Sequence, residues 1–161
     1  HELHETLRAK IKKTTFSIGI GRQYKMITSL HKSFSEAHEA IRMMQKFDGK
    51  GSISHFEDYA IYHFLESNIK AVELEDFYLK RLGKIREHDI EFGTSFMSTL
   101  ENYFAHNQNV SEAAKAMFIH RNTFIYRIDK IKELLGTDLK HSEDLLQIQL
   151  ALKIFKLLQK E

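Results

Sequence analysis

Residues 109–136 read NVSEAAKAMFIHRNTFIYRIDKIKELLG and decide the fold of the chain around them. Their pattern predicts a short helix and a longer helix joined by a tight turn. Ser111 is a good N-cap for the first helix, and Glu112 suits the positive end of its dipole. The alanines of the first helix are small enough for a second helix to pack closely across it. The stretch therefore predicts a helix-turn-helix.

The turn is predicted at residues 118–120 and the second helix at residues 121–135. Ile119 can fill the angle between the two helices. Gly136 can end the second helix in the left-handed conformation, which glycine adopts at little cost. At about 100° per residue, one stripe of the second helix is apolar and faces the core. Its members are Phe124, Ile128, Ile131 and Leu135.

The opposite face of the second helix is polar. Its members are Asn122, Tyr126, Asp129, Lys130 and Glu133, with Thr123 at the edge. The N-terminal half of this face suits base edges and phosphates, because a major groove admits one helix, usually led by its N-terminal residues. From Lys115 to Lys132 there are five Lys or Arg residues, against Asp129 alone in the second helix and no acid in the turn. That local excess of four positive charges is the pattern of phosphate contact.

Two functions remain open on the residues alone. The first is DNA binding through this face. The second is a helical protein-interaction or dimerisation module with an incidental basic surface, because basic amphipathic helix pairs also occur in proteins that never meet DNA. Arg127 is equally ambiguous: it can reach a phosphate or pair with an internal carboxylate. Asp129 and Glu133 indicate that the C-terminal half of the helix leaves the groove, since carboxylates repel phosphate.

A family resemblance favours the first function. Residues 120–155 read HRNTFIYRIDKIKELLGTDLKHSEDLLQIQLALKIF, with EAAKAMF before them. This string resembles the C-terminal helix-turn-helix of the PucR/CdaR class of bacterial transcriptional regulators, with HRNT, YR, LLG and LQIQLAL in the family's order and spacing. The resemblance covers residues 75–161 well and the earlier part more weakly. It implies a sequence-specific regulator of a catabolic operon that acts on double-stranded DNA in the cytoplasm and is not an enzyme.

Under this interpretation a defined set of side chains contacts DNA. They are Ser111, His120, Arg121, Asn122, Thr123, Tyr126, Arg127 and Lys130. Asn122 and Tyr126 are assigned to base edges. Arg121, Lys130 and Thr123 are assigned mainly to phosphates. His120, at the start of the second helix, suits a cap or a phosphate contact.

The expected partners follow from the same interpretation. We expect a homodimer, because one helix reads only a few base pairs and regulatory affinity usually comes from two half-sites about 34 Å apart. The resemblance assigns any small-molecule effector to an N-terminal region that is missing from this sequence. The fragment is therefore expected to bind DNA constitutively and without a cofactor.

Residues 1–57 predict a small α/β segment. The expected elements are a helix at 1–13, a strand at 14–20, a helix from Ser33 or Ser35 to Phe47, and a short strand at 52–56. This segment resembles the closing half of a GGDEF-like domain, in which a SIGI-type strand precedes a SEAHEA-type helix. The signature of nucleotide cyclases would lie before residue 1, so no cyclase activity is inferred. Gly19 and Gly21 hint weakly at a phosphate loop, but Tyr24 stands where the dinucleotide fingerprint needs glycine.

The rest of the chain is expected to be helical. We expect a helical connector at 58–92, with helices near 58–65 and 75–85, and a helix-turn-helix domain at 93–161. Thr94 is the expected cap of the first helix in that domain, and Ser142 opens a last helix that is apolar around much of its girth. Such a helix must be buried against the helix-turn-helix or a second subunit. The predicted fold class is mainly α, a helix-turn-helix bundle preceded by a partial GGDEF-like α/β segment.

Composition narrows the function further. The chain has no Cys, which excludes disulfides and thiolate chemistry and suits a reducing cytoplasm. No apolar run approaches the roughly 18 residues of a membrane span, so no membrane contact is expected. The net charge of +2 is carried by residues 109–161. Ten histidines raise the question of a metal, but His1 and His4 form the closest pair and the others are scattered, so no metal site is expected.

Overall fold

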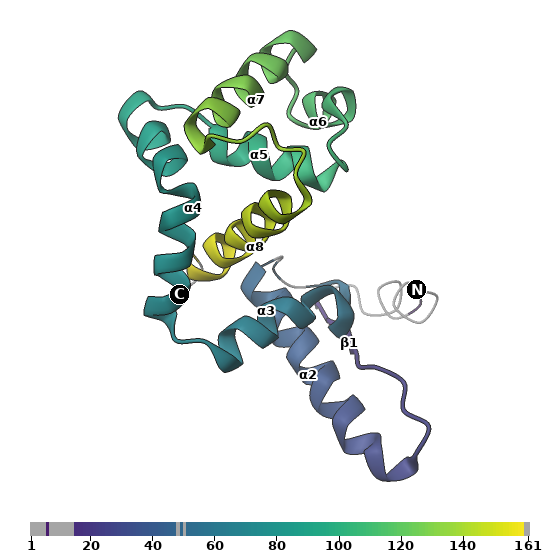
Figure 1. The fold of residues 1–161 in the computed structure, drawn as a ribbon. Coiled ribbons are helices and arrows are strands. Elements are labelled where there is room, and N and C mark those ends of the chain that lie inside the picture. Colours follow the sequence, from purple (N-terminus) through teal and green to yellow (C-terminus); the bar gives the residue numbers. More distant parts are fainter. Residues whose placement is uncertain (1–5, 7–14, 48, 50, 160–161) are drawn as a thin grey trace. The chain divides into compact units, whose positions relative to one another are not determined.

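The computed structural model describes residues 6, 15–47, 49 and 51–159. These residues divide into two compact units, called unit 1 (up to Lys70) and unit 2 (Ala71–Gln159) below (Figure 1). The helix predicted at residues 1–13 lies outside the described residues except for Thr6, and so does the His1–His4 pair. The division of the chain at residues 57 and 92 stays a prediction.

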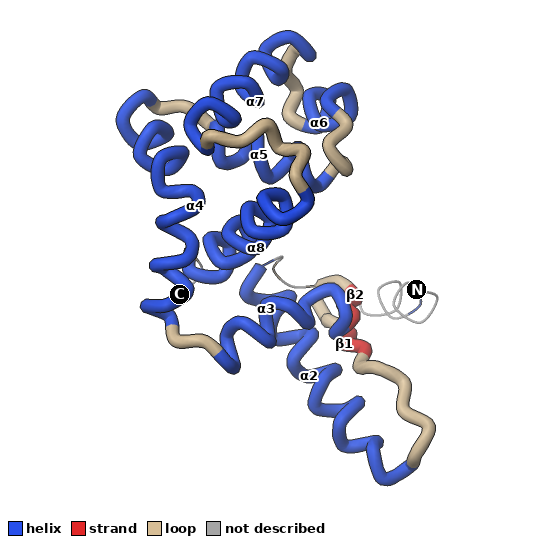
Figure 2. Tube along the Cα trace, viewed as in Figure 1, coloured by secondary structure: helices blue, strands red, loops and turns tan. Residues whose placement is uncertain are grey.

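Unit 1 contains a short parallel pair of strands, drawn red in Figure 2. β1 (Ile18–Ile20) runs beside β2 (Ile53–His55), with Ile18 opposite Ile53. The strand predicted at 14–20 is therefore confirmed only in its last part, because the ladder has no partner for the earlier residues.

Helices follow both strands of unit 1. The elements are η1 (Ile27–Ser29), α2 (Leu30–Phe47) and α3 (Phe56–Asn68). The prediction that α2 begins at Ser33 or Ser35 was wrong, because the 3-10 turn η1 continues directly into the helix at Leu30. The buried face of α2 is formed by Ala40, Met43, Met44 and Phe47.

Two glycines let α2 lie against β1. A Cβ atom at Gly19 would stand 2.0 Å from the carbonyl oxygen of Ala37, and one at Gly21 would stand 2.0 Å from that of Ser33. Any side chain would push the helix away, since real Cβ atoms do not approach backbone oxygen that closely. Close helix packing therefore explains these glycines, without the phosphate loop that their spacing suggested.

Unit 2 is helical throughout its regular structure. Its elements are α4 (Ala71–Phe92), α5 (Phe96–Ala105), α6 (Val110–Ala116), α7 (Arg121–Leu135) and α8 (Ser142–Leu158). The prediction of a mainly α fold is confirmed. In Figure 1, α6 and α7 lie at one end of unit 2, with α5 beside them. In this arrangement the first turns of α7 expose Arg121, Asn122, Thr123 and Tyr126.

The last helix is buried within its own unit. α8 packs chiefly along α4 and buries Ile148, Ala151, Leu152, Ile154 and Leu157. Leu146, near its start, stays 61% exposed. Much of the apolar surface of α8, which suggested contact with a second subunit, is therefore already covered by α4. Among the described helices, none has the length and apolar character that a membrane span requires.

Candidate nucleic-acid interface

The first helix of the helix-turn-helix is capped by Asn109. Its side-chain oxygen accepts hydrogen bonds from the backbone N–H groups of Ser111 (3.0 Å) and Glu112 (3.2 Å). The prediction of Ser111 as the N-cap was wrong, because the helix begins at Val110 and Ser111 lies inside its first turn. Ser111 is exposed there.

The turn between the two helices is held by backbone hydrogen bonds. The N–H of Phe118 donates to the oxygen of Lys115, and the N–H of Ile119 donates to that of Ala114, both at 3.1 Å. Ala114 is buried, as the close approach of α7 requires. Ile119 is only half-buried, so it fills the angle between the helices in part. Phe118 has a φ of 55°, in the left-handed region.

His120 fixes the start of α7. Its Nδ1 accepts the backbone N–H of Asn122 at 3.2 Å, which makes His120 the N-cap. Of the two roles predicted for His120, the cap is therefore confirmed. Because Nδ1 of His120 accepts a hydrogen bond, the neutral ring carries its proton on Nε2. This Nε2–H group can donate a hydrogen bond to an anion.

The two faces of α7 follow the predicted pattern. Phe124, Ile128 and Ile131 are buried, while Leu135 is half-buried. The predicted base-edge and phosphate residues of the first turns are exposed, namely Arg121, Asn122, Thr123 and Tyr126. Gly136 ends the helix with a φ of 67°, as its position predicts. The helix bounds 121–135 are confirmed as well.

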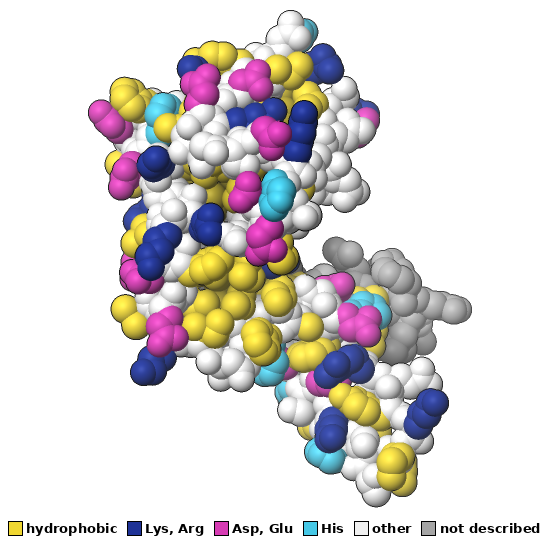
Figure 3. Space-filling model, in the orientation of Figure 1, with side chains coloured by type: hydrophobic (Ala, Val, Ile, Leu, Met, Phe, Trp, Pro, Cys, Tyr) yellow, Lys and Arg dark blue, Asp and Glu magenta, His cyan; other side chains and the backbone are white. Residues whose placement is uncertain are grey.

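Acidic neighbours reduce the positive charge of the C-terminal half of α7. Lys130 pairs with Glu133 at 2.7 Å, and the hydrogen bond to that carboxylate raises the pKa of Lys130. Lys132 stands 3.6 Å from Asp129. On the face drawn in Figure 3, basic and acidic side chains are interspersed over this end of unit 2. The number of Lys and Arg residues from Lys115 to Lys132 therefore overstates the positive charge of this surface, because the acidic Glu133 follows directly after Lys132.

Unpaired positive charge stands at the other end of α7. In the described part of the chain, Lys115 and Arg121 have no acidic partner, and both are exposed. Arg127 is partly buried, and its Nη1 donates to the hydroxyl of Thr99 at 3.4 Å. Arg127 thus pairs with a hydroxyl of α5 rather than with the internal carboxylate that was considered.

A groove runs beside the exposed face of α7. It has a volume of about 700 Å³ and lies between α7 and the segment joining α4 to α5. Thr123, Tyr126, Arg127 and Lys130 line it from α7, and Thr94 and Ser95 line it from the joining segment. Four of the predicted DNA-contacting residues are therefore brought together. No signal in the sequence indicated that Thr94 and Ser95 would lie opposite them; Thr94 was predicted only as a helix cap.

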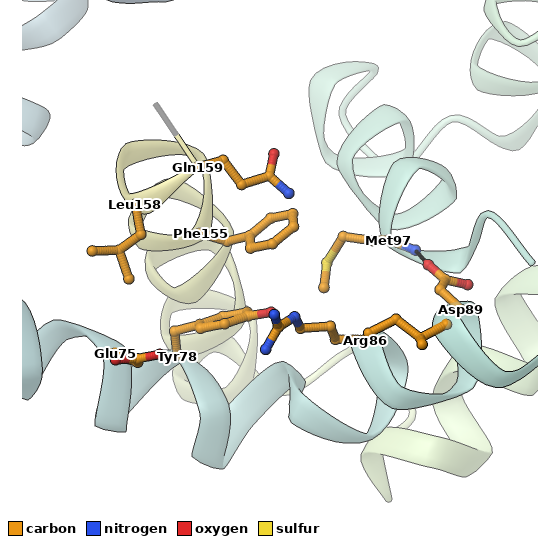
Figure 4. Close-up of a pocket in the computed structure, with 9 residues that line it drawn as sticks. Glu75, Tyr78, Arg86, Asp89, Met97, Phe155, Leu158 and Gln159 are labelled. Atoms are coloured by element: carbon orange, nitrogen blue, oxygen red, sulfur yellow. Dashed lines mark hydrogen bonds between the residues drawn. The ribbon is translucent and has the colours of Figure 1, made fainter. Parts of the chain in front are cut away.

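Asp89 holds the joining segment in place. Its carboxylate accepts the backbone N–H groups of Phe96 and Met97, both at 2.8 Å, at the start of α5. Figure 4 shows the hydrogen bond from Met97. The hydroxyl of Thr94 donates to the same carboxylate. The prediction that Thr94 caps α5 was wrong, because Asp89 takes that role and Thr94 supports it.

A second cavity, of about 520 Å³, lies between α4, α8 and the start of α5 (Figure 4). The rings of Tyr78 and Phe155 stack there at 5.1 Å, and burial raises the pKa of the Tyr78 hydroxyl. The cavity is lined by the positively charged Arg86 and the negatively charged Glu75, so its charge favours no single class of ligand. Among the described residues, no three His, Cys, Asp or Glu side chains gather as a metal site would need.

Comparison with known proteins matches two parts of the chain. Residues 96–154 match the PucR C-terminal helix-turn-helix domain, and residues 1–43 match a GGDEF-like domain. The exposed face of α7 lies within the first match, and so does the α7 side of the groove, whereas the groove residues His88, Gly93, Thr94 and Ser95 precede it.

Several curated proteins are similar to the chain over most of its length. The proline-responsive transcriptional activator PutR of Bacillus subtilis is 33% identical over 144 residues, which cover 89% of this chain and 35% of PutR. The purine catabolism regulatory protein of the same organism is 30% identical over 91% of this chain and 27% of its own length. The carbohydrate diacid regulator of Escherichia coli is 45% identical over 56 residues, 35% of this chain and 14% of that protein. The chain thus spans about a third of the length of PutR and about a quarter of that of the purine catabolism regulatory protein.

Proposed function

Residues 96–154 make this chain a member of the PucR family of helix-turn-helix domains, and from that membership we propose that it binds double-stranded DNA as a sequence-specific transcriptional regulator. The names of two relatives refer to proline and to purine catabolism, which supports a catabolic operon as the target and the cytoplasm as the location. The relatives are named as regulators, which supports a role other than catalysis.

One observation carries the proposal. The first turns of α7 expose Arg121, Asn122, Thr123 and Tyr126, while the opposite face is buried against the rest of unit 2. A helix anchored on one side and polar on the other at its N-terminal end fits a major groove. In the proposed complex Asn122 and Tyr126 meet base edges, and Arg121 and Thr123 meet phosphates. Ser111, His120, Arg127 and Lys130 complete the proposed set.

Binding to a pool of random duplexes, followed by sequencing of the retained fraction, tests sequence-specific recognition. We expect a common motif to emerge, and the logarithm of the binding constant for it to fall linearly with the logarithm of the salt concentration. Failure to retain any duplex at low salt would leave the alternative, a helical interaction module without DNA binding.

The pairing of Lys130 predicts unequal effects of two charge removals. Arg121→Ala should weaken all sequences about equally and lower the salt slope by about one unit, because a phosphate contact is lost. Lys130→Ala should lower the slope less, because Glu133 already neutralises its ammonium group. Titrations at several salt concentrations measure both slopes. Lys80→Ala is the control, since Lys80 is exposed on α4, outside the helix-turn-helix. A larger slope change for Lys130→Ala than for Arg121→Ala would contradict this assignment.

We propose that the regulator is a homodimer. Unit 1 exposes a row of apolar side chains at η1 and the start of α2, namely Met26, Ile27, Leu30 and Phe34, each more than 60% exposed. A patch of this kind supports a contact with a second copy.

Sedimentation at micromolar concentration should give twice the mass of 19.0 kDa. The double variant Ile27→Lys, Phe34→Lys should give the single mass, and Phe92→Lys, at another exposed aromatic, should not. A monomeric native chain, with DNA present, would rule the dimer out.

Effector recognition is assigned to a region outside these residues. The chain spans about a quarter to a third of the relatives' length, which leaves room for a separate sensing domain in a protein of that size. The fragment is therefore proposed to bind DNA without a small molecule.

A further inference from the structure

Phe118 is an aromatic side chain that contributes little to the fold. It lies in the turn between α6 and α7 and is 96% exposed, more than any other large apolar side chain in the described ranges. Burying an aromatic side chain stabilises a fold, and here that stabilisation is absent. Packing inside unit 2 therefore does not explain a phenylalanine at this position.

The backbone at Phe118 also disfavours phenylalanine. Its φ of 55° lies in the left-handed region, which is unfavourable for a residue with a Cβ atom. The hydrogen bonds from Phe118 to Lys115 and from Ile119 to Ala114 hold the turn in this shape. Glycine would suit the position better on both counts. A contact outside the chain would account for the ring.

The charges around Phe118 indicate what that contact is. Lys115 stands three residues before it and Arg121 three residues after it, both exposed and both without an acidic partner in the described part of the chain. The positive end of the α7 dipole lies beside the same turn. A polyanion with apolar groups between its charges would match both the exposed ring and the positive charges on either side of it. Duplex DNA has this character, because the methyl groups of thymine line its major groove between two rows of phosphates.

We propose that Phe118 is a specificity-determining residue that packs its ring against a thymine methyl group beside the N-terminal end of α7. This inference rests on the proposed function, since it adds a base contact to the same interface. Lys115 and Arg121 hold the phosphates on either side, and the rigid turn presents the ring without an ordering cost.

The variant Phe118→Gly separates this role from a structural one. We expect the thermal midpoint of the 161-residue chain to stay level or rise, because glycine relieves the left-handed conformation. We expect affinity for the selected duplex to fall about tenfold, as loss of one buried ring face would predict. Phe118→Tyr keeps the ring and should keep the affinity within about twofold. A residue that only supported the fold would show a lower midpoint together with any loss of affinity.

Removal of single methyl groups from the DNA tests the contact itself. In the duplex selected by the native chain, each thymine is replaced in turn by uracil, which lacks only the C5 methyl group. Replacement of one thymine by uracil should weaken binding of the native chain several-fold and leave binding of Phe118→Gly unchanged.

Equal affinity of the native chain and Phe118→Gly, or the absence of such a uracil position, would overturn the inference while leaving the proposed function intact. Failure of the native chain to bind any duplex would instead refute the proposed function. A change in sedimenting mass of Phe118→Gly without DNA would assign the ring to a protein contact and also overturn the inference.

Discussion

Replacing Ile128 with aspartate should unfold unit 2. Ile128 is 3% exposed on the buried face of α7, between Phe124 and Ile131. The substitution removes a buried aliphatic side chain and brings a carboxylate into an apolar site without a partner. Together these effects should lower the free energy of unfolding by about 4 kcal/mol or more, against a total of about 5–15 kcal/mol for a typical domain. Loss of helical circular dichroism and a lower urea midpoint would measure it.

The matched control is Ile90→Asp. Ile90 is 73% exposed on α4, so the same change there should alter the free energy of unfolding by no more than about 0.5 kcal/mol. Ala114→Asp should resemble Ile128→Asp, because Ala114 is 3% exposed beneath α7. Ile119 was expected to be a core residue, but it is half-buried, so a charge there should cost less. Equal stability of Ile128→Asp and Ile90→Asp would contradict the description of the α7 core.

Asn122→Ala should change which DNA sequences bind, without changing the fold. The Asn122 side chain is exposed and forms no hydrogen bond in the described part of the chain, while its backbone N–H donates to His120. Asparagine can bond adenine through two hydrogen bonds, so its loss should cost about 1–3 kcal/mol on the preferred site and relax selectivity at one position. Repeating the random-duplex selection with the variant measures both effects. An unchanged motif for Asn122→Ala, with an altered motif for Lys130→Ala, would mean that the orientation of α7 in the groove is wrong.

The bounds of α7 were predictable because several local signals agree. The apolar spacing of Phe124, Ile128 and Ile131 sets the helical face, and Gly136 supplies the left-handed residue that ends it. The start of α6 was missed because Asn109 and Ser111 are both good caps two residues apart. The backbone chose Asn109 after a reversal in which Asn107 and Gln108 have positive φ.

Contacts between distant residues could not be predicted from the local pattern. Asp89 caps α5 only because the chain reverses at Gly93, which has a φ of 62°. Arg127 meets Thr99 across 28 positions of sequence. Which of the exposed residues contact DNA stays a prediction.

The capping of α5 by Asp89 limits where the helix-turn-helix end of the chain can be cut and joined to another protein. A fragment that begins at residue 93 keeps every helix of the helix-turn-helix but leaves the N–H groups of Phe96 and Met97 without their acceptor. A fragment that retains the last turns of α4 keeps it. The smallest portable piece therefore includes α4, along which α8 also buries its apolar side chains. A fusion that joins this end to another domain therefore has the start of a helix, Ala71, at its junction.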